Sequence, residues 1–133
     1  YFGSISQMTQ LYLLKTIFAK SKEEINKFSK TSNERLLSSA NALYEILDNH
    51  KIPYIKAWSA IFVFVDLSRF LDENTYDGEK KLQGKLFNEL KVLLTPGKDC
   101  HAPCPGWFRV CMAAVPIESL VEAIRRITNK FCV

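Results

Sequence analysis

An arginine within an apolar segment is the residue of this sequence whose type and setting best suit chemistry. Arg109 lies in Trp107–Ala113 (W-F-R-V-C-M-A), where its neighbours are apolar. Burying a guanidinium among such residues is costly unless an anion meets it. Strand alternation places Arg109 on the face opposite Phe108 and Val110, and its planar fork matches a carboxylate. The segment therefore indicates either a carboxylate-binding arginine or an edge-strand arginine that pairs with a nearby Asp or Glu or reaches solvent.

A second group of reactive side chains precedes that segment. Cys100, His101 and Cys104 form a C-H-x-x-C pattern. A structural zinc site needs four ligands, so Cys111 or His50 would have to complete the set from a distance. A Cys-His nucleophilic pair lacks an orienting acid, and adjacent residues rarely face each other. We expect no metal site and no catalytic residue in this C-H-x-x-C pattern, and we expect the four cysteines of the sequence to be reduced thiols.

The elements that must position these residues follow from hydrophobic periodicity and from breaker residues. Ser21 and Glu24 form a capping box that begins a helix of roughly 28 residues, or about 42 Å at 1.5 Å per residue. Such a length suits an element that links two parts of a larger molecule. The pattern predicts helices over 6–20 (with one buried face), 21–49, from 77 and from 116, and strands over 59–67, 92–95 and 107–113. This order predicts an α+β fold, in which helices cover a small antiparallel-rich sheet and a long helix precedes it.

Composition narrows the classes of partner. The 18 basic residues are interleaved with 14 acidic ones, for a net charge of +4, and they form no patch or arm of the kind that binds nucleic acid. The longest apolar run, Ala60–Val65, is too short to span a bilayer, and the N-terminus lacks the features of a signal peptide. We therefore expect a cytoplasmic protein with no nucleic-acid or membrane partner. The chain begins at Tyr1 rather than Met, which favours part of a longer protein.

Several collinear segments resemble one enzyme family. The most specific are P-G-x-x-C-H at Pro96–His101 and P-G-W-F-R-V-C at Pro105–Cys111. The segments Phe2–Gln10, Asn33–Leu36 and Ala60–Leu67 extend the resemblance over essentially the whole chain. Together they are similar to the C-terminal region of 1-aminocyclopropane-1-carboxylate synthases, within the class I/II aminotransferases.

The resemblance implies a place for each part of the chain. It implies the small domain of the pyridoxal-phosphate-dependent transferase fold type I: residues 1–20 as a helix from the end of the large domain, 21–50 as the long interdomain helix and 51–133 as the C-terminal small domain. It implies that Arg109 binds the α-carboxylate of an amino-acid substrate and so orients the α-carbon. The expected partners are this substrate, the large domain of the same protein and a second copy in a homodimer.

The cofactor implied by the resemblance is pyridoxal phosphate. In the family its Schiff-base lysine lies upstream of the segment matched by Tyr1, so we expect no cofactor-binding residue here and no activity from the chain alone. The implied function of the intact protein is that of a lyase or an aminotransferase.

Two departures from the family pattern support an alternative. Cys104 replaces the usual Glu before Pro-Gly-Trp, and Ala60 replaces a Gly, which adds a Cβ near a site where the backbone must approach a ligand. The alternative is a catalytically degenerate homologue that serves as a binding or scaffolding protein. A third class is a free-standing interaction module that uses exposed helix faces.

Overall fold

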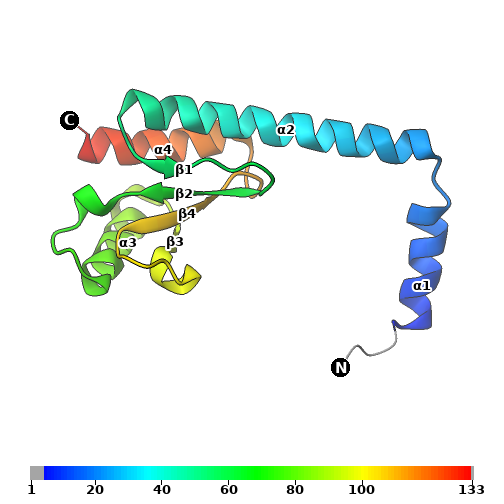
Figure 1. The fold of residues 1–133 in the computed structure, drawn as a ribbon, viewed down its shortest axis with the longest axis horizontal. Helices are drawn as coiled ribbons and strands as arrows, with labels where there is room; N and C mark the ends of the chain where they lie inside the picture. Colours follow the sequence, from blue (N-terminus) through cyan, green and yellow to red (C-terminus); the bar gives the residue numbers. More distant parts are fainter. Residues whose placement is uncertain (1–4, 133) are drawn as a thin grey trace. The chain divides into compact units, whose positions relative to one another are not determined.

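The computed structural model describes residues 5–132, so Phe2 and Gly3 of the family-like N-terminal segment lie outside the described part. The chain divides into two compact units, Tyr1–Arg35 and Leu36–Val133. In chain order (Figure 1) the elements are α1 (Gln7–Leu13), a π-helical turn (Leu14–Phe18), α2 (Lys22–Asn49), β1 (Tyr54–Ile55), β2 (Phe62–Asp66), a 3-10 turn (Ser68–Phe70), α3 (Tyr76–Leu90), β3 (Thr95–Pro96), a 3-10 turn (Gly97–Cys100), β4 (Trp107–Cys111) and α4 (Ile117–Phe131).

The predicted start and length of the long helix are confirmed. The hydroxyl of Ser21 accepts a hydrogen bond from the Glu24 backbone N–H at 3.2 Å, and the Glu24 carboxylate accepts one from the Ser21 N–H at 3.0 Å. This is the reciprocal capping box that the sequence predicts. The helix that follows, α2, has 28 residues.

The predicted buried face of the first helix is wrong for this chain. Its apolar side chains are exposed: Met8, Leu11, Leu14, Ile17 and Phe18. An amphipathic stripe becomes buried only where a second layer of structure packs on it, and the described residues of the Tyr1–Arg35 unit are helical with no sheet. Hydrophobic periodicity thus predicts the helix correctly, but it does not show whether another element of the chain covers the apolar face.

The sheet of the Leu36–Val133 unit has four strands in the order β1-β2-β4-β3, and each neighbouring pair is antiparallel. It confirms the predicted antiparallel-rich sheet, but four details differ. The sequence does not predict the two-residue strand β1. The expected strand over 59–67 pairs only at Phe62–Asp66, and the one expected over 92–95 pairs only from Thr95. The strand expected over 107–113 ends at Cys111.

A helix cap explains the late start of β3. Lys91 adopts a left-handed conformation (φ 57°) just after α3, and the Val92 N–H donates to the carbonyl of Leu86 at 3.0 Å. This bond uses the backbone of the predicted strand to satisfy the end of the helix. The side chains of Val92 and Leu94 are still buried, so the apolar pattern marks core contact rather than strand pairing.

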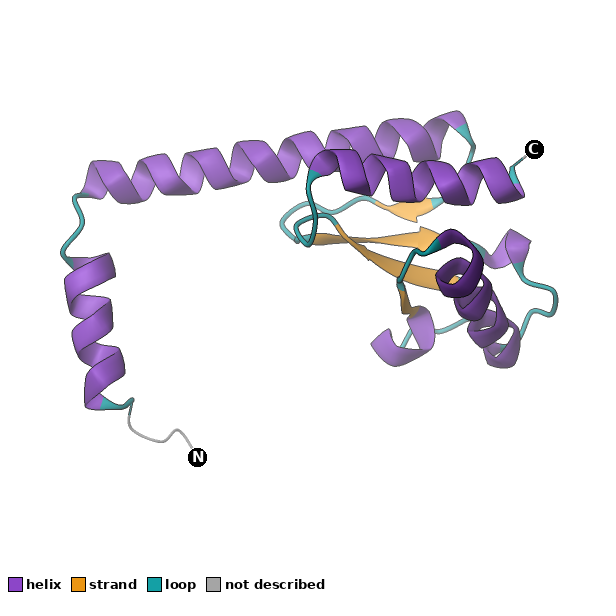
Figure 2. Ribbon diagram, turned by 180° about the vertical axis from the view of Figure 1, so that it is seen from behind, coloured by secondary structure: helices purple, strands orange, loops and turns teal. Residues whose placement is uncertain are grey.

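One face of the sheet carries the core. Val63 and Val65 of β2 and Phe108 and Val110 of β4 are all buried. They belong to one cluster with residues from the C-terminal half of α2 and from α3 and α4: Leu43, Leu47, Leu82, Leu86, Leu120 and Ile124. Figure 2 shows α4 beside the C-terminal half of α2 over the strands. The alternate residues of the strands therefore lie on a second, more open face.

Candidate functional site

Arg109 lies in the middle of the open sheet face. It is half-buried on β4, a central strand, directly opposite Phe64 of β2 on one side and Thr95 of β3 on the other. Its neighbours Phe108 and Val110 are buried on the helix-covered face, as strand alternation predicts. The alternative of an arginine on an edge strand is therefore wrong.

The guanidinium of Arg109 has few partners within the chain. Its Nη2 donates to the Oγ1 of Thr95 at 3.4 Å, and its Cζ lies 5.2 Å from the ring centroid of Phe62. Within residues 5–132 it forms no ion pair with a carboxylate. A guanidinium has five N–H donors, so most of them stay available to an incoming anion.

The surroundings of Arg109 favour a carboxylate ligand. The rings of Phe62 and Phe64 meet edge to face with centroids 6.4 Å apart, and that of Phe62 supports the cation through its π face. Asp66, on the same face of β2, uses its Oδ1 to accept the Ser68 N–H at 2.8 Å. Aromatic walls lower the local dielectric, which strengthens a charge-charge contact with a bound carboxylate.

The C-H-x-x-C pattern does not form a site of its own. Cys100 ends a 3-10 turn, His101 follows it in a left-handed conformation (φ 57°), and Cys104 is exposed. Among residues 5–132 no group of three or more His, Cys, Asp or Glu side chains is placed to hold a metal ion. All four cysteines are free thiols, and Cys111 is half-buried two residues after Arg109, on the same sheet face.

Glu79 is a buried carboxylate that the sequence did not single out. It lies in the first turn of α3, and only 1% of its surface is exposed. Its Oε1 accepts the Lys98 N–H at 3.0 Å and its Oε2 accepts the Gly106 N–H at 2.7 Å. An acidic residue early in a helix predicts only a favourable interaction with the helix dipole at the surface. Its burial depends on a loop that returns from far along the chain.

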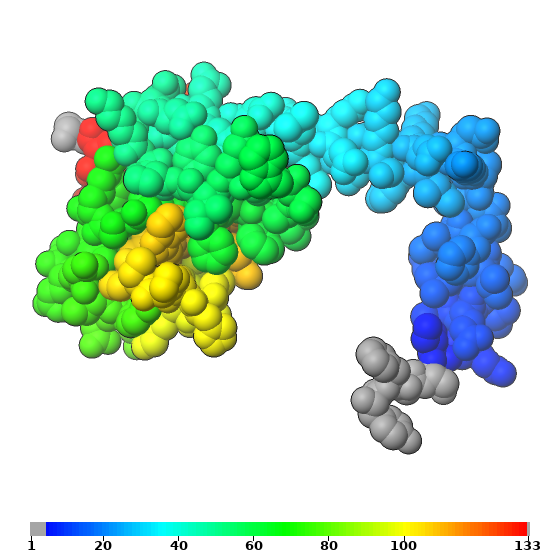
Figure 3. All heavy atoms as spheres, viewed as in Figure 1, coloured from blue at the N-terminus to red at the C-terminus, as the bar shows by residue number. Residues whose placement is uncertain are grey.

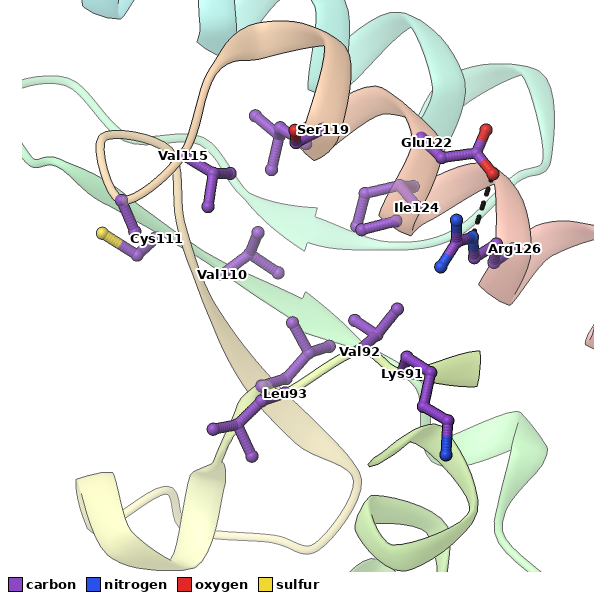
Figure 4. Close-up of a pocket in the computed structure, with 14 residues that line it drawn as sticks. Lys91, Val92, Leu93, Val110, Cys111, Val115, Ser119, Glu122, Ile124 and Arg126 are labelled. Atoms are coloured by element: carbon purple, nitrogen blue, oxygen red, sulfur yellow. Dashed lines mark hydrogen bonds and ion pairs between the residues drawn. The ribbon is translucent and has the colours of Figure 1, made fainter. Parts of the chain in front are cut away.

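A pocket of about 470 Å³ lies on the helix side of the sheet (Figure 4). Aliphatic side chains such as Val92, Val110 and Ile124 line it, and an ion pair between Glu122 and Arg126 lies at one end. Arg109 is not among its lining residues. Its charged lining consists of this pair and Lys91, whose Nζ donates to the carbonyl of Asn88 at 2.8 Å.

Comparison with solved structures shows the fold of the chain. The chain resembles the Thermus thermophilus aspartate aminotransferase tetra mutant 2 complexed with tryptophan, with a TM-score of 0.72 and 23% identity over 92% of this chain and 28% of that one. It also resembles the aromatic aminotransferase of Pyrococcus horikoshii, with a TM-score of 0.69 and 18% identity over 84% of this chain and 29% of that one. The fold class is confirmed as that of the fold type I aminotransferases.

Sequence relatives then give the family. The family profile described as aminotransferase class I and II matches residues 2–127. 1-Aminocyclopropane-1-carboxylate synthase 5 of Arabidopsis thaliana is 32% identical over 95% of this chain and 26% of its own, and 1-aminocyclopropane-1-carboxylate synthase 6 of Oryza sativa is 33% identical over 96% and 24%. The chain belongs to the class I and II aminotransferase family. It spans about a quarter of the length of these relatives.

The family assignment bears on the cofactor and the substrate that the sequence analysis expects. Members of the family depend on pyridoxal phosphate and act on amino acids.

No helix among residues 5–132 is long and apolar enough to cross a membrane.

Proposed function

We propose that the intact protein is a pyridoxal-phosphate-dependent lyase or aminotransferase similar to 1-aminocyclopropane-1-carboxylate synthase, and that Arg109 binds the α-carboxylate of its amino-acid substrate. The observation that carries the proposal is an arginine at the centre of an open sheet face with no carboxylate partner in the described chain. The kind of anion follows from the family, whose members act on amino acids.

Arg109 would act by binding and by orientation. Two parallel N–H bonds from its guanidinium fix the plane of a carboxylate, and a fixed carboxylate leaves the α-carbon in one orientation. Pyridoxal phosphate, when bound, withdraws electrons from that α-carbon. Phe62 holds one side of the cation, which limits the directions from which a ligand can approach. This chain would thus contribute binding and orientation of the substrate.

In this proposal the residues of this chain bind the substrate, and the cofactor-binding lysine lies elsewhere in the intact protein. None of the lysines among residues 5–132 is buried, and none is a strand residue of the face that carries Arg109. We therefore place the Schiff-base lysine upstream of Tyr1 in the intact protein, and expect the chain alone to be inactive. No reaction step is assigned to the residues of this chain beyond substrate binding.

The same proposal gives a role to the N-terminal residues. Residues 1–20 would end the large domain, 21–50 would form the interdomain helix and 51–133 the small domain of a cytoplasmic homodimer. Exposed apolar side chains between residues 5 and 28 support it, among them Leu11, Tyr12, Phe18 and Phe28. In the intact protein these side chains would be covered by the large domain or by the second copy, because a large exposed apolar surface favours association.

The test uses the intact protein loaded with pyridoxal phosphate. Visible absorption reports both cofactor loading and amino-acid binding. We expect Arg109→Lys to weaken amino-acid binding by roughly 10- to 100-fold, because a lysine cannot form the bidentate pair. Cofactor loading should not change. Arg125→Lys is the matched control, since Arg125 is exposed on α4.

Two results would overturn the proposal in different ways. Unchanged amino-acid affinity in Arg109→Lys would remove the role of Arg109. An unmodified protein without a borohydride-fixed absorption band would favour the catalytically degenerate homologue. That second candidate is supported by Cys104 and Ala60, which depart from the family pattern and are both exposed in this chain.

A further inference from the structure

The carboxylate of Glu79 ties together the two ends of one loop. Lys98 lies just after β3 and Gly106 just before β4, and the backbone N–H of each donates to a different oxygen of Glu79, at 3.0 and 2.7 Å. Seven residues, 99–105, lie between these two N–H groups in the sequence. One buried side chain therefore fixes where the chain leaves β3 and where it enters β4.

The residues at those two points lead directly to the site. Thr95 lies three residues before Lys98, and Trp107 immediately follows Gly106. The carbonyl of Gly106 also accepts the Leu67 N–H at 2.8 Å, which joins the same point to the end of β2. Figure 3 shows the loop, in yellow, packed beside the orange start of β4. The position of β4 relative to both neighbouring strands thus depends on this junction.

Both hydrogen-bond donors to the Glu79 carboxylate are backbone N–H groups. It forms no ion pair within residues 5–132, and its charge is held by two peptide N–H groups and by the positive end of the α3 dipole. A carboxylate bonded to two backbone groups specifies the positions of those groups. Gln in its place would keep one acceptor oxygen and set an amide N–H₂ against a backbone donor.

We infer that Glu79 is a positioning residue for Arg109. By fixing both ends of the loop, it sets the spacing of β3 and β4 and so holds the Thr95 hydroxyl 3.4 Å from the Arg109 guanidinium. The inference rests on the proposed function of Arg109 and extends it. A guanidinium held in one position binds a carboxylate more tightly than a mobile one. At a reacting centre, a displacement of about 1 Å can lower the rate by orders of magnitude.

The experiment compares an amino acid with its α-carboxamide in the intact, cofactor-loaded protein. The carboxamide is similar in shape but lacks the charge that Arg109 binds. We expect Glu79→Gln to lower amino-acid affinity by roughly tenfold and carboxamide affinity by less than about twofold, so that the preference for the acid falls. Glu89→Gln is the matched control, because Glu89 lies on the same helix but pairs with Lys130 at the surface. A general loss of stability would lower both affinities alike and so would not change the preference for the acid over the carboxamide.

Arg109→Lys, measured in parallel, separates the two ideas. If Arg109→Lys leaves the preference for the acid unchanged, the proposed function fails. If Arg109→Lys lowers the preference while Glu79→Gln leaves it at the unmodified level, the positioning inference is overturned. In the double variant we expect no further loss of preference beyond that of Arg109→Lys, because the two residues act through one contact.

A second variant covers the case in which Glu79→Gln does not yield folded protein. Thr95→Val removes only the hydroxyl beside Arg109 and keeps the shape of the side chain. We expect it to lower the preference for the acid in the same direction. An unchanged preference in Thr95→Val would overturn the inference.

Discussion

Glu79 and Arg109 are both charged residues, but the chain provides hydrogen-bond partners for only one of the two charges. The carboxylate of Glu79 is buried and receives two backbone N–H bonds from its own chain. The guanidinium of Arg109 is half-buried and has one long contact, at 3.4 Å, to a neutral hydroxyl. A charge that has its partners within the chain is typical of a structural residue, whereas a cation with free donors can still bind an anion. This difference supports the separate roles proposed for Glu79 and Arg109.

Gly106 donates its backbone N–H to Glu79, and its own conformation makes it sensitive to substitution. Its φ is 96°, and an added Cβ would lie 2.5 Å from the Cα of Ser68. We expect Gly106→Ala to lower the free energy of unfolding by about 1–3 kcal/mol, because an L side chain there is strained and also collides with backbone. Urea unfolding followed by circular dichroism would measure the change.

Gly84 offers the opposite test on the same chain. It lies within α3, and an added Cβ would meet nothing within 4 Å. Gly84→Ala should therefore raise the free energy of unfolding by about 0.5–1 kcal/mol. Equal effects of the two substitutions would contradict the account of Gly106.

How far these residues can be predicted from sequence depends on where their partners lie. Arg109 stands out because its apolar neighbours are adjacent in the chain, and the role proposed for it comes from the family resemblance. Glu79 does not stand out, because its partners Lys98 and Gly106 lie 19 and 27 positions away. Their contact exists only once β3 and β4 are paired, so no local pattern contains it.

Among the secondary-structure elements, β1 depends on α2 through an aromatic contact. The rings of Tyr54 and Tyr44 stack with centroids 4.8 Å apart, and the Tyr54 hydroxyl donates to Asp48 at 3.3 Å. Burial, followed by the hydrogen bond to Asp48, raises the pKa of Tyr54 above its ordinary value. The folded chain therefore keeps this phenol protonated to a higher pH than the unfolded chain does.

The pH dependence that follows has a definite sign. The stabilisation by protonated Tyr54 is fully present below its unfolded pKa of about 10 and is lost as the pH rises through the raised folded pKa. Asp48→Asn should lower the pKa of Tyr54 but leave it above the ordinary value, because burial remains. Titration of the tyrosine ring by NMR would measure it, with Glu45→Gln on the same helix as control. No change in the pKa of Tyr54 on Asp48→Asn would contradict the role of Asp48.

Helices were easier to predict than strands for a physical reason. A capping box such as Ser21 and Glu24 is a local signal, and both of its hydrogen bonds are present. Strand ends depend on which backbone groups are still free to pair. Val92 gives its N–H to the end of α3, and the two-residue β1 has too few residues to show an alternating pattern.

The residues of the hydrophobic core all come from one continuous part of the described chain. In the part that the structure describes, every buried residue lies between Ala40 and Thr128, within the Leu36–Val133 unit. Before Leu36 the apolar side chains are mainly exposed, including Met8, Phe18 and Phe28. Periodicity identifies a stripe of apolar residues but cannot say whether the covering surface belongs to the same chain.

This division predicts how a shortened chain behaves. A chain that begins at Leu36 should keep the free energy of unfolding of the 133-residue chain within about 1 kcal/mol, because buried apolar area is the main source of stability. It should also self-associate less, because it lacks the exposed apolar side chains of residues 5–28. Urea unfolding and sedimentation velocity at several concentrations would measure the two effects.

Substitutions in the 133-residue chain distinguish loss of apolar surface from loss of length. Replacing Leu11, Phe18 and Phe28 together by Ser should reduce self-association as the truncation does and leave the unfolding midpoint unchanged, since all three side chains are exposed. A large fall in stability from either change would show that the first 35 residues contribute to the core. Persistent association of the shortened chain would instead assign the contact to the Leu36–Val133 unit, where the exposed Trp58 and Leu93 would be the first side chains to replace.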